Sequence, residues 1–141
     1  MGYSHYYQQH QTLSPTEWES LTRDITKLIE QSWDVALWVE VTKEFVTING
    51  VGEQEHETFT LYRNDTRWES CKTARKNYDP LVTAILILLR YTYPSFSVSS
   101  DGSWEDWIEG RELFKEVFYL EPSKESVFGN DNHIYPARSL S

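Results

Sequence analysis

Cysteine is almost absent from this sequence of 141 residues, and basic residues are scarce. The single cysteine, Cys71, excludes an internal disulfide and a metal site built from several cysteines. Thirteen lysines and arginines stand against 22 acidic residues, which gives a net charge of −9. This balance argues against broad, non-specific binding to nucleic acid, which needs a cationic surface. It leaves room for one local anion site.

Long hydrophobic runs are also lacking. The longest apolar stretch, residues 81–89, is interrupted by Thr83 and is far too short to cross a bilayer. The first residues contain no basic region followed by an apolar one, as a secretion signal would. The sequence contains no repeat and no linker either. We therefore expect a soluble, cytoplasmic protein of one domain that makes no use of a membrane.

Aromatic residues, in contrast, make up 15% of the chain, and three segments show the pattern of a helix. Ser14 opens a capping box with a proline at the first helical position, and apolar residues recur at helical spacing to about residue 31. Asp79 is the expected N-cap of a second helix, whose apolar residues leave almost no polar face and predict a buried position. A third helix is expected from Ser103.

Short segments rich in β-branched and aromatic residues predict strands between these helices. The expected strands are residues 2–7, 35–41, 45–48, 58–62 and 96–99. Strands and helices do not alternate in a regular βαβ order, so the predicted class is α+β. We expect a single domain over residues 1–121, with an antiparallel sheet of about four to five strands packed against three helices, the middle one buried. Residues 122–141 are expected to form an irregular arm.

The strongest candidate for a binding site lies in the basic segment of residues 63–76, where five cations oppose two acids. It leads into the predicted helix at residue 79, whose free N–H groups and dipole favour an anion. The candidate ligand-binding residues are Lys72, Thr73, Arg75, Lys76 and Tyr78. The cations would hold a phosphate, and the tyrosine ring offers a surface on which a base could stack. The alternative is that the cations only balance acidic neighbours on a solvated surface.

Two further segments carry candidate ligand-binding residues. Tyr3 and His5 would share one face of the first strand, where they could contact a ligand or simply pack. Asp101 could bind a ligand hydroxyl, although a Ser-Ser-Asp-Gly sequence more often forms a turn. The acidic residues 53–57 around His56 alternate across a strand and cannot converge on one ion. We therefore expect no metal and no cofactor.

Three segments also carry a resemblance to a known family. They read Gly-Tyr-Ser-His-Tyr at residues 2–6, Cys-Lys-Thr-Ala-Arg-Lys-Asn-Tyr-Asp at 71–79 and Ser-Ser-Asp-Gly at 99–102. The chain resembles an uncharacterised family of small proteins from bacteria and their phages, typically with Gly-Tyr-Thr-His-Tyr and Cys-Lys-Thr-Ala-x-Lys-Pro-Tyr-Asp. It departs from this pattern at Ser4 and at Asn77, which leaves the central loop less rigid. The resemblance implies a shared fold and marks the same segments, but it implies no mechanism.

These observations lead to three hypotheses of function. The first is a non-catalytic binding module for a small anionic, nucleotide-like ligand; encoded by a phage, it could sequester a signalling nucleotide in the host cytoplasm. The second is an acidic protein–protein inhibitor or adaptor of a host enzyme, which would use the acidic face of the last predicted helix. That face consists of Glu105, Asp106, Glu109, Glu112 and Glu116. The third is an enzyme acting on a phosphorylated compound with His5 as general acid or base, but no complete catalytic constellation is found. The sequence leaves a homo-oligomer open.

Overall fold

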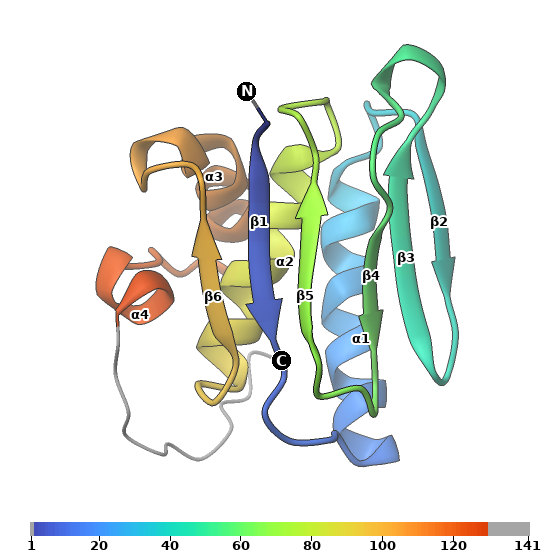
Figure 1. Cartoon of the computed structure of the whole chain (residues 1–141), viewed down its shortest axis with the longest axis vertical. Helices are drawn as coiled ribbons and strands as arrows, with labels where there is room; N and C mark the ends of the chain where they lie inside the picture. The colour runs from blue at the N-terminus through green and yellow to red at the C-terminus, as the bar shows by residue number, and fades with distance from the viewer. Residues whose placement is uncertain (1, 130–141) are drawn as a thin grey trace.

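The computed structural model describes residues 2–129, which form six strands and four α-helices. The strands lie side by side in one layer, and the three longer helices cover one face of it (Figure 1). The strands are β1 (Ser4–Gln8), β2 (Leu37–Val41), β3 (Phe45–Gly50), β4 (Phe59–Tyr62), β5 (Trp68–Lys72) and β6 (Ser97–Ser100). The helices are α1 (Pro15–Gln31), α2 (Asp79–Thr92), α3 (Ile108–Phe118) and α4 (Lys124–Phe128), with short 3₁₀ segments η1 (Gly52–Gln54) and η2 (Glu105–Trp107). None of the helices in residues 2–129 has the length and apolar character needed to cross a bilayer.

The strands form two antiparallel sheets of three, ordered β5–β1–β6 and β2–β3–β4. This arrangement confirms the predicted α+β class. The described residues contain six strands in two sheets, whereas the sequence predicted four or five strands in one. β1 is the central strand of the first sheet, with His5 opposite Cys71 on β5 and opposite Ser100 on β6. Segments far apart in the sequence therefore meet at His5.

Helix α1 begins as the sequence predicts. The Oγ atom of Ser14 accepts a hydrogen bond from the Glu17 N–H at 3.1 Å, and Glu17 Oε1 accepts one from the Ser14 N–H at 2.9 Å. This capping box satisfies N–H groups that a helix start leaves without partners. The predicted apolar face is buried: Trp18, Leu21, Ile25 and Leu28. The face therefore belongs to the core.

Helix α2 lies at the centre of the core, as its apolar sequence predicts. Residues 81–90 are all buried, and the helix packs against α1, α3 and α4. Its start differs from the prediction by one residue. Tyr78 is the N-cap, without a side-chain capping bond, and Asp79 is the first helical residue. The carboxylate of Asp79 is therefore available for other partners.

Strand β5 corrects part of the interpretation of residues 71–79 as a loop, because Cys71 and Lys72 lie in the strand. The sequence Trp-Glu-Ser-Cys-Lys lacks β-branched residues, so its local preference for a strand is weak. Pairing with the central strand β1 decides its conformation. Cys71 points into the core and is fully buried, whereas Trp68 is 60% exposed. The first three cations of the basic segment therefore lie before or on a strand, and only Arg75 and Lys76 lie in the turn that leads to α2.

The predicted irregular arm, residues 122–141, is also corrected in its described part. Ser123 caps α4, because its Oγ atom accepts a hydrogen bond from the Ser126 N–H at 3.2 Å. Val127 is buried in the core cluster, and α4 packs against α2. The compact domain therefore extends beyond residue 121, where the sequence placed its end. Residues 130–141 lie outside the described part.

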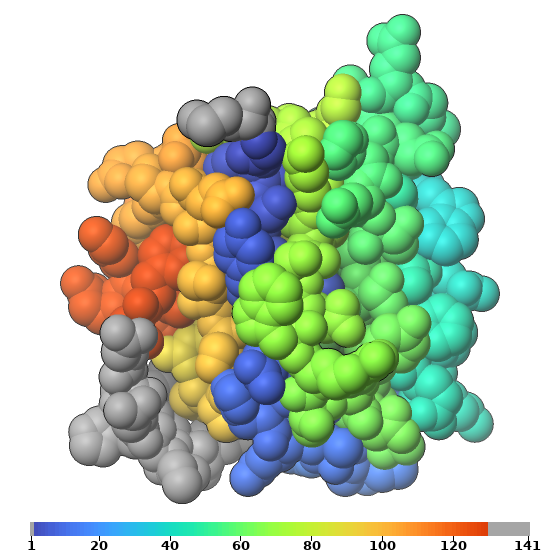
Figure 2. All heavy atoms as spheres, viewed as in Figure 1, coloured from blue at the N-terminus to red at the C-terminus, as the bar shows by residue number. Residues whose placement is uncertain are grey.

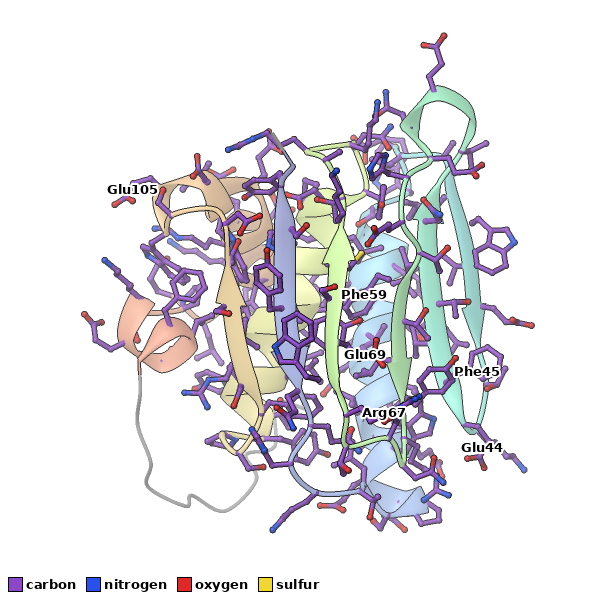
Figure 3. All side chains as sticks on the ribbon, viewed as in Figure 1. Glu44, Phe45, Phe59, Arg67, Glu69 and Glu105 are labelled. Atoms are coloured by element: carbon purple, nitrogen blue, oxygen red, sulfur yellow. The ribbon has the colours of Figure 1, made fainter. Side chains whose placement is uncertain are left out.

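The face of the strand layer opposite the helices is open (Figure 2). The rings of Tyr6 and Trp68 stack on it with their centroids 5.5 Å apart. The rings of Phe45 and Tyr62 are also in contact, at 6.1 Å, and Figure 3 shows the side chains around them. The aromatic residues are thus divided between the core and this face.

Gly110 allows α3 to approach α2 closely. A Cβ atom at this position would overlap the Thr83 hydroxyl and come within 2.8 Å of Thr83 Cβ. A helical Gly→Ala substitution normally stabilises by about 1 kcal/mol. Here we expect Gly110→Ala to lower the free energy of unfolding by about 1–3 kcal/mol in urea denaturation, because the interface is overpacked. Glu112→Ala on the exposed side of α3 is the control. Equal stability of the two variants would contradict this packing.

Candidate functional site

A buried polar network surrounds His5 at the start of α2. The His5 side chain is completely buried. Its Nε2 atom lies 2.6 Å from Asp79 Oδ1, and its Nδ1 atom lies 2.7 Å from Ser100 Oγ. Thr73 donates its hydroxyl to the same Asp79 oxygen at 2.5 Å. The network therefore connects β1, β6, the turn after β5 and the first residue of α2.

The surroundings of Ser100 decide which group donates in this network. Ser100 Oγ accepts hydrogen bonds from the Gly102 N–H at 2.9 Å and from the Trp107 indole N–H at 3.1 Å. Because both acceptor positions are occupied, the hydroxyl hydrogen is directed to His5 Nδ1. His5 then carries its proton on Nε2 and donates it to the Asp79 carboxylate. No nitrogen of the ring is left for a ligand.

Arg75 covers one side of this network. Its guanidinium carbon lies 3.9 Å from the centroid of the Tyr3 ring, and its Nη1 atom lies 3.6 Å from Asp106 Oδ1. The Tyr3 ring contacts the His5 ring edge-on, with the centroids 5.1 Å apart. Ala74 and Arg75 have φ values of 52° and 60°, in the left-handed region that costs a residue with a Cβ atom about 1–2 kcal/mol. The turn that presents Arg75 is therefore strained.

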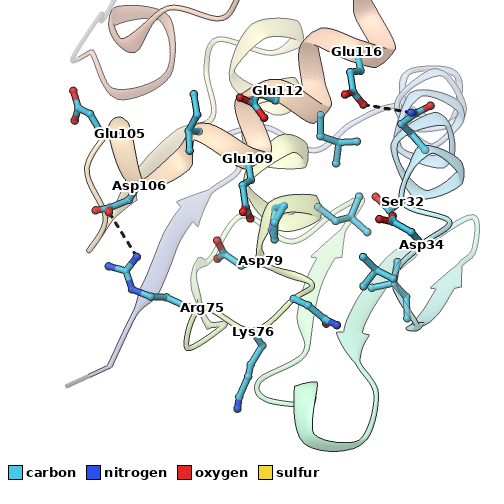
Figure 4. Close-up of a pocket in the computed structure, with 18 residues that line it drawn as sticks. Ser32, Asp34, Arg75, Lys76, Asp79, Glu105, Asp106, Glu109, Glu112 and Glu116 are labelled. Carbon is cyan, nitrogen blue, oxygen red and sulfur yellow. Dashed lines mark hydrogen bonds and ion pairs between the residues drawn. The ribbon is translucent and has the colours of Figure 1, made fainter.

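A groove of about 690 Å³ lies beside the network, lined by residues of α1, α2, α3 and the turns next to them (Figure 4). Of the four residues His5, Thr73, Asp79 and Ser100, only Asp79 lines it. The network thus reaches the groove through one carboxylate. Within residues 2–129, seven carboxylates line the groove: Asp34, Asp79, Glu105, Asp106, Glu109, Glu112 and Glu116.

The groove is acidic along most of its lining. Among the described residues only Arg75 and Lys76 bring positive charge to it, and Arg75 already faces Asp106. Figure 4 shows the Glu109 and Asp79 carboxylates near one another and Lys76 extending away from them. An excess of carboxylates on a concave surface produces a negative potential, which attracts cations and repels anions.

The structure separates the three cations that were predicted to hold one anion. Arg75 and Lys76 line the groove, but Lys72 does not. The Lys72 chain passes beside Gly2, where a Cβ atom would lie 2.7 Å from Lys72 Cε. Only two of the three cations are therefore placed to contact one ligand in the groove.

Other predicted ligand-binding residues are used inside the fold. Tyr78 is completely buried and donates its hydroxyl to the Glu57 carbonyl at 2.5 Å. Burial also raises the pKa of Tyr78 above its ordinary value. The expected stacking of a base on this ring is therefore corrected, because the ring has no exposed face. Thr73 is buried as well, with its hydroxyl bound to Asp79, and His5 is enclosed by its two partners.

Asp101 lies in the bend after β6, and its carboxylate bonds to two residues of β1. Its Oδ2 atom accepts a hydrogen bond from the Ser4 N–H at 3.0 Å, and its Oδ1 atom accepts one from the Tyr6 hydroxyl at 2.9 Å. Sequence reasoning missed Asp79 and Ser100 as network members, because both were assigned to a helix start and a turn. Within residues 2–129, no group of three His, Cys, Asp or Glu side chains is arranged to hold a metal ion.

Comparison with known proteins gives no assignment for this site. No protein-family model matches the chain, and no curated protein or solved structure matches it. The resemblance to the bacterial and phage family therefore stays a prediction. The function has to be argued from the chemistry of the groove and of the network beside it.

The Asp79 carboxylate should be a major contributor to stability. Asp79→Ala leaves the His5 Nε2–H and the Thr73 hydroxyl without an acceptor, and buried polar groups that lose a partner are costly. We expect a loss of about 2–4 kcal/mol in the free energy of unfolding. Thr73→Val removes one donor and keeps the shape of the side chain, so its loss should be about 1 kcal/mol. Urea denaturation compares the two variants, and equal losses would contradict the shared acceptor.

Cys71 should be chemically inert in the folded protein. Burial, followed by the nearby Glu57 carboxylate, raises the pKa of the thiol to about 12. At pH 8 the thiol is therefore protonated as well as inaccessible, and the thiolate is the reactive form. We expect a chromogenic disulfide reagent to react with the folded protein at least about a thousandfold more slowly than with protein unfolded in urea, because the thiol reacts only after the structure opens. A fast reaction proportional to reagent concentration, without denaturant, would contradict the burial of Cys71.

Proposed function

We propose that the protein is a non-catalytic binding module whose acidic groove binds a positively charged segment of a partner protein. The observation that carries the proposal is the lining of the groove, in which seven carboxylates oppose two cations within the described part of the chain. A groove of about 690 Å³ also has the size at which protein surfaces bind ligands. The acidic helix face predicted from the sequence, residues 105–116, contributes five of these carboxylates.

The apolar part of the lining supports a lysine-rich or arginine-rich segment over a small inorganic cation. Apolar side chains lie between the carboxylates along the groove: Val35, Leu37, Pro80, Leu81, Ile108 and Leu113. Lysine and arginine have apolar stems that pack on such surfaces while their charged ends reach carboxylates. A basic peptide segment would therefore use both kinds of lining.

The chemistry of the network supports binding rather than catalysis. Ser100, His5 and Asp79 are connected in the order of a nucleophile, a base and an orienting carboxylate. A serine nucleophile needs a lone pair for attack, and both lone pairs of Ser100 Oγ accept hydrogen bonds. Of these three residues, Asp79 lines the groove, and Ser100 and His5 do not. The network thus serves to hold Asp79 in place.

Our second proposal is that the groove binds a small anionic ligand such as a nucleotide. Arg75 and Lys76 support it, because they line one end of the groove next to the start of α2. In this case Arg75→Ala and Lys76→Ala would abolish binding with little change in melting temperature, because these two cations line the groove. A panel of nucleotides in a thermal-shift assay tests it, and the absence of any shift would rule it out. Sequestration of a signalling nucleotide belongs to this second proposal.

Reversal of groove charges tests the first proposal. We expect purified protein to bind short fluorescent oligolysine and oligoarginine peptides in fluorescence anisotropy, more weakly as salt rises, because the groove attracts cations electrostatically. The double variant Glu109→Lys/Glu112→Lys should weaken this binding at least about tenfold, since two attractive contacts become repulsive.

The matched control is Glu40→Lys/Glu125→Lys, which changes the net charge equally at exposed positions that do not line the groove. It should weaken binding by no more than about threefold, as expected for a long-range charge effect. Equal losses in both double variants would show that only net charge matters and would contradict the groove.

A further inference from the structure

One end of the groove already holds a guanidinium group. The Arg75 guanidinium lies between the face of the Tyr3 ring, 3.9 Å from its centroid, and the carboxylate of Asp106, 3.6 Å away. An aromatic face combined with a carboxylate is a favourable site for a planar guanidinium, which stacks on the ring and pairs with the acid. We call the Tyr3 ring and the Asp106 carboxylate the guanidinium clamp.

The two parts of the clamp are fixed without Arg75. Tyr3 is 5% exposed, and its ring is held edge-on by His5. Gly102 lies so close to the ring that a Cβ atom there would overlap the Tyr3 hydroxyl. Burial raises the pKa of Tyr3 to about 12, so the ring is neutral and presents its ordinary electron-rich face.

Asp106 is fixed by the turn before η2. Its Oδ2 atom accepts hydrogen bonds from the Ser103 N–H at 2.8 Å and from the Ser103 hydroxyl at 3.0 Å. These bonds lower the pKa of Asp106, which keeps the carboxylate ionised. The clamp would therefore keep its shape and charge if Arg75 moved away.

Arg75 is the replaceable partner in this arrangement. Its side chain is 60% exposed, and its ion pair with Asp106 is long. Exposed ion pairs of this kind contribute little to stability. The left-handed backbone of Ala74 and Arg75 adds strain to the turn that carries the guanidinium. An incoming arginine would meet the same ring and the same carboxylate that Arg75 leaves.

We propose that Arg75 is an internal ligand of the guanidinium clamp and that an arginine of the partner segment displaces it. This inference rests on the proposed function of the groove and adds to it a preference for arginine over lysine. The preference arises because a guanidinium can stack on the Tyr3 ring while it faces Asp106, and an ammonium lacks this planar geometry. Arg75 then limits the affinity of the free protein for its partner.

Removal of Arg75 tests the internal ligand. We expect Arg75→Ala to raise the affinity for an oligoarginine peptide about twofold to fivefold more than for an oligolysine peptide of equal length, the size of an exposed cation–π contribution. Lys76→Ala is the matched control, because it removes the same charge from the same groove without emptying the clamp. It should raise the two affinities equally.

A second pair of variants tests the clamp itself. In the Arg75→Ala background, Asp106→Asn should abolish the extra gain for oligoarginine. Glu105→Gln, which removes a neighbouring groove carboxylate, should preserve it. Melting temperatures verify that all variants fold.

The outcomes separate this inference from the proposed function. If the wild-type protein binds both peptides and Arg75→Ala favours oligoarginine no more than Lys76→Ala does, the internal ligand is refuted and the acidic groove stands. If Arg75→Ala loses oligoarginine binding, the internal ligand is refuted as well. If neither peptide binds to any form of the protein, both the groove and the clamp are refuted.

Discussion

The Asp79 carboxylate accepts two hydrogen bonds from buried donors at the first residue of the central helix. Through His5 it is connected to the central strand of the first sheet, and through Thr73 to the turn after β5. His5 extends the connection to Ser100 at the end of β6. This single carboxylate thus ties three strand ends to the start of the buried helix. It also lines the groove, so the same group that organises the fold takes part in the candidate site.

Features with a local cause could be predicted from the sequence. The capping box at Ser14 depends on residues three positions apart, and the burial of α2 follows from its almost continuous apolar run. Strand β5 and the division into two sheets depend on pairing between distant segments, which no local pattern contains. Helix α4 was missed because its five residues, Lys124–Phe128, are too few to show a helical period. The α+β class was predicted correctly despite these errors, because it depends only on which kinds of secondary structure the chain contains.

The candidate site shows the same division between local and distant causes. The acidic face of residues 105–116 and the basic turn at Arg75 could be found from composition. The meeting of this acidic face and this basic turn in one groove could not be predicted from the sequence. Nor could the contribution of Asp34 and Asp79, which join the groove from other elements. Sequence charge alone suggested that the basic residues form the site. Among the described residues, the folded chain brings more carboxylates than cations to the same groove, and this is why we propose a cationic segment ahead of the anionic ligand.

The central position of β1 also bears on how the chain is assembled during synthesis. His5 bonds to Ser100, 95 positions later in the sequence. During synthesis, both backbone edges of β1 therefore stay unpaired until first β5 and then β6 have emerged from the ribosome. Closing loops of this length is slow compared with the formation of local contacts. Nascent chains that pause between β5 and β6 still expose one free edge of β1, at which a strand of another chain can add.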